Sequence, residues 1–210
     1  MKDWFVDRLV ERTVKKLNEN FFKAISFDDQ TEFFQHLLSM IPQGAVVGIG
    51  GSVTVRELGI IGRLKEKGLT LLDHWQENLS NDEKAAIRKS QLTCHVFITG
   101  TNAITENGEI VNMDGIGNRV ASMIYGPEKV IIVAGYNKIV RDLNRAFERI
   151  KEIAAPMNAK RLGLPLPCAE LGYCVECKSE KRICRILTVI QRRPPETDIY
   201  VLLLKEYLGF

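Results

Sequence analysis

Residues 45–54 read Ala-Val-Val-Gly-Ile-Gly-Gly-Ser-Val-Thr, and this stretch decides the fold class. Its first half, 45–49, is a short apolar run bounded by glycines, as expected of a buried parallel strand. Apolar residues from Val53 to Leu64 then recur at helical spacing, so a helix is predicted directly after the glycines. A strand, a glycine-rich turn and a helix in succession indicate an α/β fold.

The alternation of strands and helices extends to both sides of this stretch. Further strands are predicted at 22–27, 69–72, 94–99, 109–112 and 130–134. Further helices are predicted at 3–19, from Asp29 to Pro42, and at 81–89, 116–124 and 139–153. Strands separated by helices predict an open, mostly parallel sheet with helices on both of its faces.

The tail of the chain, residues 165–210, has a different character. Two runs rich in β-forming residues, 185–191 and 198–204, are joined by Arg192-Arg-Pro-Pro-Glu-Thr. This pattern predicts a hairpin or a strand pair at the edge of the sheet, and so a β-rich C-terminal edge. Because no stretch has the composition of a flexible linker, residues 1–210 are predicted to form a single domain that includes the tail.

Composition excludes several classes of protein. The 210 residues are 45% apolar, enough for one buried core, and the 29 basic and 26 acidic residues nearly cancel. No segment concentrates Lys and Arg among aromatic residues, so a nucleic-acid partner is not predicted. No apolar run approaches the ~20 residues of a membrane-spanning helix, and the N-terminus lacks the apolar core of a secretory signal. The chain is therefore predicted to be cytoplasmic, with neither nucleic-acid nor membrane partners.

The glycine-rich loop after the first core strand is a candidate anion site. Glycine lets backbone N–H groups approach a ligand closely, and hydroxyl groups at a helix start can donate further hydrogen bonds to a phosphate or carboxylate. The candidate ligand-binding residues of this loop are Gly48, Gly50, Gly51, Ser52 and Thr54. Glycines also occur simply to make tight turns, and that alternative stays open. The spacing matches neither the Walker loop nor the dinucleotide fingerprint, so ATP and NAD are not indicated.

A second group of polar residues lies between Gly100 and Met123. Asn107-Gly108 is a strong turn signal, and the residues from Gly115 to Arg119 open a helix. The carboxyl ends of parallel strands meet at one edge of a sheet, so the two loops are predicted to share one crevice. The side chains expected there are Ser52, Glu106, Asp114, Asn118 and Arg119. For Asn107 and Asn112 a turn or cap role is favoured.

Four cysteines near the end of the chain form a candidate metal site. They are Cys168, Cys174, Cys177 and Cys184, with the spacing C-x5-C-x2-C-x6-C. A CxxC pair can chelate one metal ion, and two further thiols could complete a zinc site or an iron–sulfur cluster. The spacing matches no standard ferredoxin run, and a cluster of structural thiols is the open alternative. The histidines, His36, His74 and His95, are interpreted as structural.

Several runs of residues resemble one known family. They are Gly-Gly-Ser-Val-Thr-Val-Arg-Glu-Leu-Gly (50–59), Ala-Ile-Thr-Glu-Asn-Gly (103–108), Gly-Asn-Arg-Val-Ala-Ser-Met (117–123), Gly-Pro-Glu-Lys-Val-Ile-Ile-Val (126–133) and Tyr-Asn-Lys-Ile-Val (136–140). Over essentially the whole chain they resemble the lactate-utilisation (LUD) domain family. The resemblance implies the fold shared by glucosamine-phosphate isomerase, ribose-phosphate isomerase and the CoA transferases. It also implies an association with the oxidation of lactate to pyruvate, in which some members are regarded as non-catalytic components of an iron–sulfur system.

The leading hypothesis from the sequence is a LUD-family protein that binds a small anionic metabolite as an accessory component in the oxidation of lactate or a related 2-hydroxy acid. Its expected protein partner is a second copy of the chain or a lactate-oxidising complex. The resemblance extends the candidate ligand-binding residues to Asn102, Asp114, Gly117, Asn118, Arg119 and Lys138.

Two alternatives to this hypothesis remain. The first is an enzyme resembling the CoA transferases or the sugar-phosphate isomerases. Glu106-Asn-Gly is similar to the motif in which CoA transferases keep their carboxylate nucleophile, so Glu106 is the catalytic candidate. Asn102 stands where methylthioribose-phosphate isomerases carry a catalytic Asp, and an amide cannot act as a general acid or base. The second alternative is a redox module that carries zinc or an iron–sulfur cluster.

Overall fold

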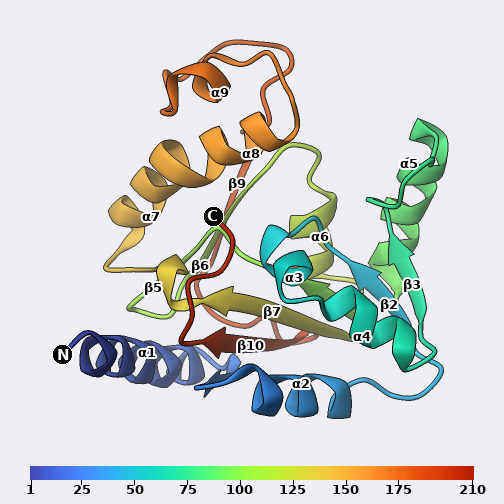
Figure 1. Cartoon of the computed structure of the whole chain (residues 1–210), viewed down its shortest axis with the longest axis vertical. Coiled ribbons are helices and arrows are strands. Elements are labelled where there is room, and N and C mark those ends of the chain that lie inside the picture. The colour runs from blue at the N-terminus through green and yellow to red at the C-terminus, as the bar shows by residue number, and fades with distance from the viewer.

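The structure is a computed structural model that describes residues 1–210, apart from the side chain of Lys2. It contains two sheets with helices packed around them (Figure 1). The strands are β1 (Lys23–Phe27), β2 (Val46–Ile49), β3 (Thr70–Asp73), β4 (Val96–Thr99), β5 (Ala103–Thr105), β6 (Ile110–Asp114), β7 (Lys129–Gly135), β8 (Ile139–Val140), β9 (Ile186–Ile190) and β10 (Asp198–Leu204). The helices are α1 (Lys2–Glu19), α2 (Gln30–Ser39), α3 (Val53–Glu57), α4 (Ile60–Glu66), α5 (Asn81–Ser90), α6 (Asn118–Ile124), α7 (Leu143–Arg149), α8 (Ala155–Arg161) and α9 (Pro167–Leu171).

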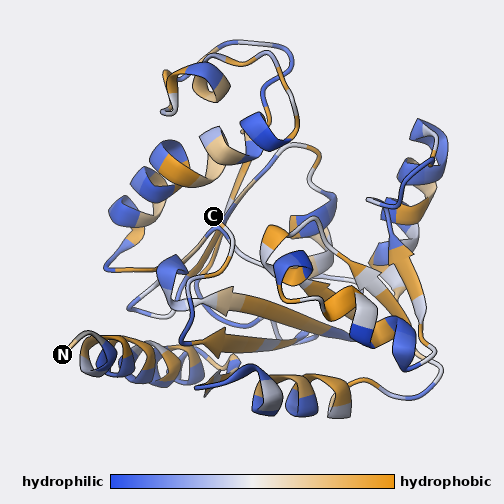
Figure 2. Ribbon diagram, viewed as in Figure 1, coloured by the Kyte–Doolittle hydropathy of each residue, from blue (hydrophilic) through white to orange (hydrophobic). Residues whose placement is uncertain are grey.

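The larger sheet has six strands, all parallel, in the order β1-β10-β7-β4-β2-β3. Its central strand β7 shows how both faces are buried. Val130 and Ile132 pack with α1 on one face, whereas Ile131 and Val133 pack with α2, α3 and α4 on the other. Figure 2 shows β7 and β10 as hydrophobic and α1 and α2 as mixed in colour, as expected for helices that lie between a core and solvent. The predicted parallel sheet with helices on both faces is confirmed.

The two strands predicted in the tail are confirmed, but the prediction that they pair with each other at a sheet edge is wrong. β10 does not form a hairpin with β9 at an edge. It lies between β1 and β7 inside the parallel sheet, and β9 pairs antiparallel with β6 in the smaller sheet. The segment with Pro194 and Pro195 therefore carries the chain from one sheet to the other. The physical reason is visible in Ile199–Leu204, an apolar run without the alternation of an edge strand and typical of a strand buried on both faces.

Two predicted helices have different boundaries. The helix expected from Val53 to Leu64 is divided into α3 and α4 at Gly59, whose φ of 69° is left-handed and ends the first helix. The helix expected at 139–153 starts later, because Ile139 and Val140 form β8 and Asp142 caps α7. It also continues further, through a π-helical turn (Ile150–Ala154) into α8.

The smaller sheet was not predicted. It has the order β8-β5-β6-β9, with β5 and β6 forming a hairpin across the predicted Asn107-Gly108 turn. The turn itself is confirmed by the φ of 80° at Gly108 and by the bond from its N–H to the carbonyl of Thr105 at 2.8 Å. β5 and β8 are too short, at three and two residues, to give a periodic signal.

Candidate functional site

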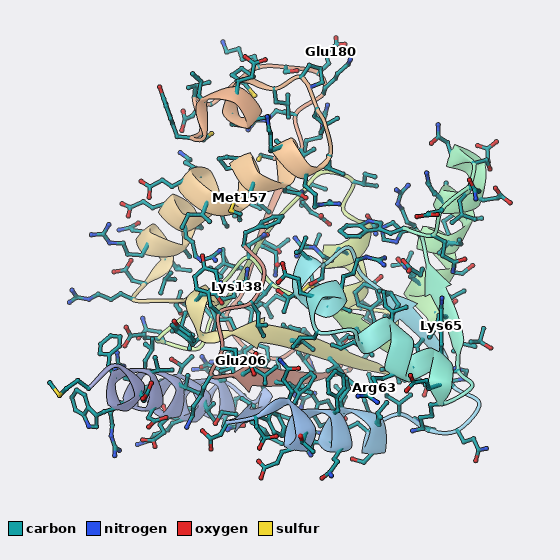
Figure 3. The ribbon with its side chains drawn as sticks, in the orientation of Figure 1. Arg63, Lys65, Lys138, Met157, Glu180 and Glu206 are labelled. Atoms are coloured by element: carbon teal, nitrogen blue, oxygen red, sulfur yellow. The ribbon has the colours of Figure 1, made fainter. Side chains whose placement is uncertain are left out.

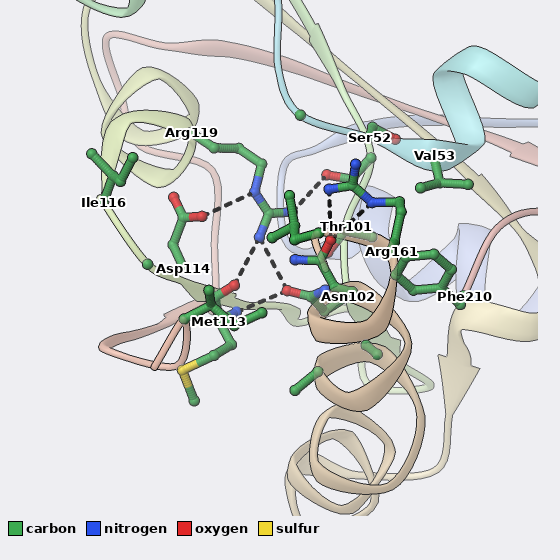
Figure 4. Close-up of a pocket in the computed structure, with 18 of the residues that line it drawn as sticks. Ser52, Val53, Thr101, Asn102, Met113, Asp114, Ile116, Arg119, Arg161 and Phe210 are labelled. Atoms are coloured by element: carbon green, nitrogen blue, oxygen red, sulfur yellow. Dashed lines mark hydrogen bonds and ion pairs between the residues drawn. The ribbon is translucent and has the colours of Figure 1, made fainter. Parts of the chain in front are cut away.

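A cavity of about 250 Å³ lies at the carboxyl ends of β2, β3 and β4. Residues that follow these strands line it, among them Ser52, Trp75 and Thr101, and α8 contributes further residues such as Arg161. Figure 4 shows Ser52, Thr101 and Arg161 in this pocket. Ligands of open α/β sheets bind outside the carboxyl ends of the strands, so this is the position at which a ligand site is expected.

Most of the predicted ligand-binding residues line this pocket. They are Gly51, Ser52, Thr54, Asn102, Asp114, Asn118, Arg119 and Lys138. Gly48, Gly50 and Gly117 are not part of the lining. A Cβ on Gly48 would lie 2.8 Å from Cys94 Sγ, and one on Gly50 would lie 2.5 Å from Thr99 Oγ1. These two glycines therefore permit close packing of β2 against its neighbours.

Glu106 does not lie in the pocket, contrary to the prediction that its carboxylate faces the same crevice as Ser52. It sits in the β5–β6 turn and forms an ion pair with Arg12 of α1. The reason is the hairpin: the chain reverses after β5, and the turn packs on α1, where a Cβ on Gly108 would clash with the backbone of Lys16. The pocket therefore gives no support to the catalytic role expected for Glu106, which stays a prediction.

Arg119 holds the wall of the pocket together. Its guanidinium group donates a hydrogen bond to Asn112 Oδ1 at 3.0 Å. It also donates to Asn102 Oδ1 at 3.1 Å and to the carbonyl of Met113 at 3.0 Å, and its Nε lies 3.7 Å from Asp114 (Figure 4). The residue is only 8% exposed. Because its donors are shared among the β4–β5 loop and the end of β6, Arg119 acts mainly as a positioning residue.

Two further cations line the pocket, and sequence reasoning missed both. Arg161 of α8 stacks on Trp75 with 4.1 Å between its Cζ and the ring centroid, and the described part of the chain gives it no carboxylate partner. Arg88 of α5 has a buried Nε with no hydrogen-bond partner among the described residues. Arg56 also stacks on Trp75, with its Cζ 4.7 Å from the ring centroid, but is paired with Asp73. No sequence motif marks Arg88 or Arg161, since each lies on an ordinary polar helix face.

His74 lines the pocket as a neutral side chain. Gln91 donates hydrogen bonds from its Nε2 to the carbonyls of Ile49 and Leu72, and the same Nε2 lies 3.1 Å from His74 Nδ1. Burial lowers the pKa of His74 to about 4, with the nearby Arg88 acting in the same direction. The histidine therefore adds no charge at neutral pH and is held in place by Gln91, in keeping with a structural role.

Lys138 is the most deeply buried cation of the pocket, with 1% of its surface exposed. It ends a 3-10 turn, Tyr136–Lys138, that directly follows β7. Its Nζ donates a hydrogen bond to the main-chain oxygen of Phe210. Burial, with a smaller contribution from the neighbouring Arg149, lowers the pKa of Lys138 to about 7, while Glu57 acts in the opposite direction.

Comparison with known proteins assigns the family. The family model described as the LUD domain matches residues 10–204. The chain belongs to the LUD domain family. Membership implies a role in lactate utilisation. The curated proteins include no match to this chain.

A solved structure shares the fold of this LUD domain. It is a DUF162 family protein from Deinococcus radiodurans, with a TM-score of 0.55 and 12% sequence identity over 95% of this chain and 98% of that one. At this identity the likeness shows the fold alone. Among the described residues, no helix is both long and apolar enough to cross a membrane.

The cysteines of the tail of this LUD domain gather around a second, small cavity of about 20 Å³. Its lining includes Cys168, Cys174, Cys177 and Cys184, and Cys184 also lines the main pocket. Within the described residues, however, no three His, Cys, Asp or Glu side chains are arranged to hold a metal ion. The clustering follows from the fold, whereas a zinc or iron–sulfur site stays a prediction.

Thiol labelling distinguishes the partly exposed cysteines from the buried one, and it also tests whether the cysteines of the tail bind a metal. In metal-free protein we expect Cys174 and Cys177, which are partly exposed, to react with iodoacetamide at least about 10-fold faster than Cys94. Cys94 is buried, and its burial raises its pKa to about 11, so little thiolate forms. Time-resolved peptide mapping gives the rates. A bound metal would instead protect the tail cysteines until a chelator is added, and equal labelling of Cys94 would contradict the packing described above.

Proposed function

We propose that the pocket binds a small organic carboxylate, either a 2-hydroxy acid or the corresponding 2-oxo acid. In this proposal the chain serves the oxidation of lactate or a related 2-hydroxy acid as its ligand-binding component. The family supports the metabolic role, and the pocket supports the chemical class of the ligand. Assembly with a second copy or with a lactate-oxidising complex stays a prediction.

The observation that carries this proposal is the charge of the lining. Four basic side chains line the pocket, Arg88, Arg119, Lys138 and Arg161, against one carboxylate, Asp114. Asp114 is already close to Arg119, and Lys138 Nζ donates to the main-chain oxygen of Phe210, so Arg88 and Arg161 are the cations that face the cavity without a carboxylate partner among the described residues. Cations held together in a partly buried space repel one another, and a bound anion relieves that repulsion.

The shape of the pocket favours a small ligand. A volume of about 250 Å³ is below the range of roughly 300–1,000 Å³ typical of drug-sized ligands. The polar groups that could orient a carboxylate and its neighbouring oxygen are close at hand, since Ser52 and Thr101 line the same space. Ser52 accepts a hydrogen bond from the N–H of Val55 and keeps its own hydroxyl proton to donate.

The enzyme alternative based on Glu106 finds no support in the pocket. A carboxylate nucleophile must reach the acyl carbon of its substrate, and Glu106 is instead paired with Arg12 on α1. Asp114, the carboxylate side chain that does line the pocket, lies 3.7 Å from the Nε of Arg119. Ligand binding is the function that the geometry supports best.

Calorimetric titration tests the proposal. We expect the wild-type protein to bind L-lactate and pyruvate, and to bind the neutral analogue lactamide at least about 10-fold more weakly, a difference of about 1.4 kcal/mol. The double variant Arg88→Gln, Arg161→Gln is expected to lose about 10-fold in affinity for both acids, because each change removes one cation and keeps a polar side chain of similar shape. Lys65→Gln, on the exposed surface of α4, is the matched control and should bind as the wild type does. Lactamide binding as tightly as lactate, or no binding of either acid, would refute the proposal.

A further inference from the structure

One small cavity, of about 20 Å³, brings together four thiols, the tail cysteines. They are Cys168, Cys174, Cys177 and Cys184. The first lies in α9, and the others lie between α9 and β9 in residues 172–185, which form neither helix nor strand. Figure 1 shows this segment as a loop beyond α8, and Figure 3 shows Glu180, which belongs to it, at the outer edge of the molecule.

Packing alone does not account for this arrangement. A free cysteine is usually buried like a small apolar residue, and Cys168, which is 8% exposed, fits that pattern. The other three tail cysteines are only partly buried, yet they face the same cavity. Two apolar neighbours in the segment, Tyr173 and Val175, are exposed and therefore do little to hold it in place.

Two donors beside the cavity are placed to stabilise negatively charged sulfur. The N–H of Glu176 donates a hydrogen bond to Cys174 Sγ at 3.3 Å, within the Cys-x-x-Cys turn. Arg182 lines the cavity and donates from Nη1 to the carbonyl of Cys177 at 3.0 Å, whereas its Nε is buried without a hydrogen-bond partner among the described residues. A thiolate in the cavity would give this Nε an acceptor, and hydrogen bonds and a nearby cation both favour the charged form of an acid.

We propose that the tail cysteines bind one thiophilic divalent metal ion, and that this ion is zinc. Cys174 and Cys177 supply the two-ligand bite of a Cys-x-x-Cys pair, and Cys168 and Cys184 complete the set of four thiolates that is typical of structural zinc sites. The size of the cavity favours a single ion over an iron–sulfur cluster. A volume of about 20 Å³ has room for about one water-sized particle, and a cluster of several iron and sulfide atoms is larger.

Binding requires a small rearrangement of the thiols. Within the described residues, no three His, Cys, Asp or Glu side chains have the arrangement of a metal site. Cys174 and Cys177 belong to the segment without helix or strand, so their side chains can turn toward an ion without disturbing a helix or strand. Cys168 is fixed by α9, and Cys184 precedes Arg185, whose N–H donates to the carbonyl of Asp114 at 3.0 Å.

The chemistry of the step is a simple exchange of ligands for protons. Each thiol that binds gives up its proton to solvent, and its sulfur donates a lone pair to the ion. No atom is oxidised or reduced. The step involves neither the main pocket nor its ligand, so this inference is independent of the proposed function.

Metal titration tests the inference. The full chain is prepared anaerobically with a reductant that contains no thiol, freed of metal with a chelator, and titrated with zinc in competition with a chromogenic chelator. We expect about one zinc ion per chain, bound with a dissociation constant below about 0.1 μM at pH 7, as in structural zinc sites. Cobalt(II) in the same site should show the intense visible absorption of tetrahedral thiolate coordination. The zinc form should unfold at a higher temperature than the metal-free form, because the ion binds the folded chain more tightly than the unfolded one.

Variants of single cysteines locate the site. Cys174→Ser and Cys177→Ser should each weaken zinc binding at least about 100-fold, because removal of a ligand costs more than the roughly 10–100-fold loss caused by removing a group that only orients a ligand. Cys94→Ala is the matched control. Cys94 is buried in the core beside the larger sheet and does not line the small cavity, so its replacement should leave zinc binding unchanged.

Several results would refute the inference. Folded, metal-free protein that takes up no zinc would do so, and so would zinc binding that survives both Cys174→Ser and Cys177→Ser. Iron together with acid-labile sulfide in the anaerobically purified protein would show a cluster in place of the single ion. The cobalt spectrum of the wild-type protein decides the question even if a variant does not fold, and the titration with lactate and pyruvate tests the main pocket separately.

Discussion

Replacement of Arg119 by leucine is expected to lower the free energy of unfolding by about 3–5 kcal/mol. The substitution removes the hydrogen bonds from the guanidinium group to Asn112, Asn102 and Met113 and leaves their oxygen atoms without this donor. It also leaves the carboxylate of Asp114 without its nearby cation. Buried acceptors that lose their donor and a charge that loses its counter-charge are both expensive.

Urea unfolding followed by circular dichroism measures this effect. Arg63→Leu is the matched control, because Arg63 lies on the exposed face of α4, 3.5 Å from Glu66, and exposed pairs contribute at most about 1 kcal/mol. Arg119→Lys should fall between the two, since it keeps the charge but not the planar fork that reaches several acceptors. A loss below about 1 kcal/mol for Arg119→Leu would contradict the positioning role.

Replacement of Leu203 by alanine is expected to lower the free energy of unfolding by about 2–5 kcal/mol. Leu203 is fully buried on β10, between β1 and β7, and packs in the same core as α1. Removing its side chain leaves a cavity between the parallel sheet and α1, and the close-packed neighbours relax only partly to fill it.

Leu187→Ala on β9 is the control for this prediction. Leu187 is 47% exposed on a strand of the smaller sheet, so its truncation should change stability by no more than about 0.5 kcal/mol. The midpoint of urea unfolding, at unchanged slope, gives both values. Equal effects of the two substitutions would mean that β10 is not an interior strand of the larger sheet, and would favour the edge hairpin that was predicted from the sequence.

The fold class was predictable because its signals are local. An apolar run such as 45–49, an N-cap such as Asp29 and the apolar stripe of α2 each specify one element from a few neighbouring residues, and the structure confirms these elements. The order of the strands was not predictable in the same way. β10 is last in the sequence but lies between β1 and β7, because its apolar run can be buried on both faces only inside the sheet.

Some residues of the pocket were likewise predictable from the sequence, and others were not. Sequence reasoning placed Ser52, Asp114 and Arg119 in one crevice, because residues that follow parallel strands meet at one edge of the sheet, and these residues do line the pocket. It misplaced Glu106, because a three-residue strand gives no periodic signal and the hairpin that moves this carboxylate to α1 stayed hidden. Arg88 and Arg161 could not be predicted as pocket residues. Each is an ordinary polar residue of its own helix, and the sequence does not show that these helices face the strand ends.

By itself, the sequence determined that this chain folds as a parallel α/β sheet of the LUD family with its polar loops at the strand ends. Such features depend on local periodicity, on capping residues and on motifs of consecutive residues. The tertiary structure alone decided which cations face the same cavity, which glycines serve packing, and which cysteines line the same small cavity. Charge and burial of a site depend on distances between residues far apart in the chain, and those distances are set only when the helices and strands pack together.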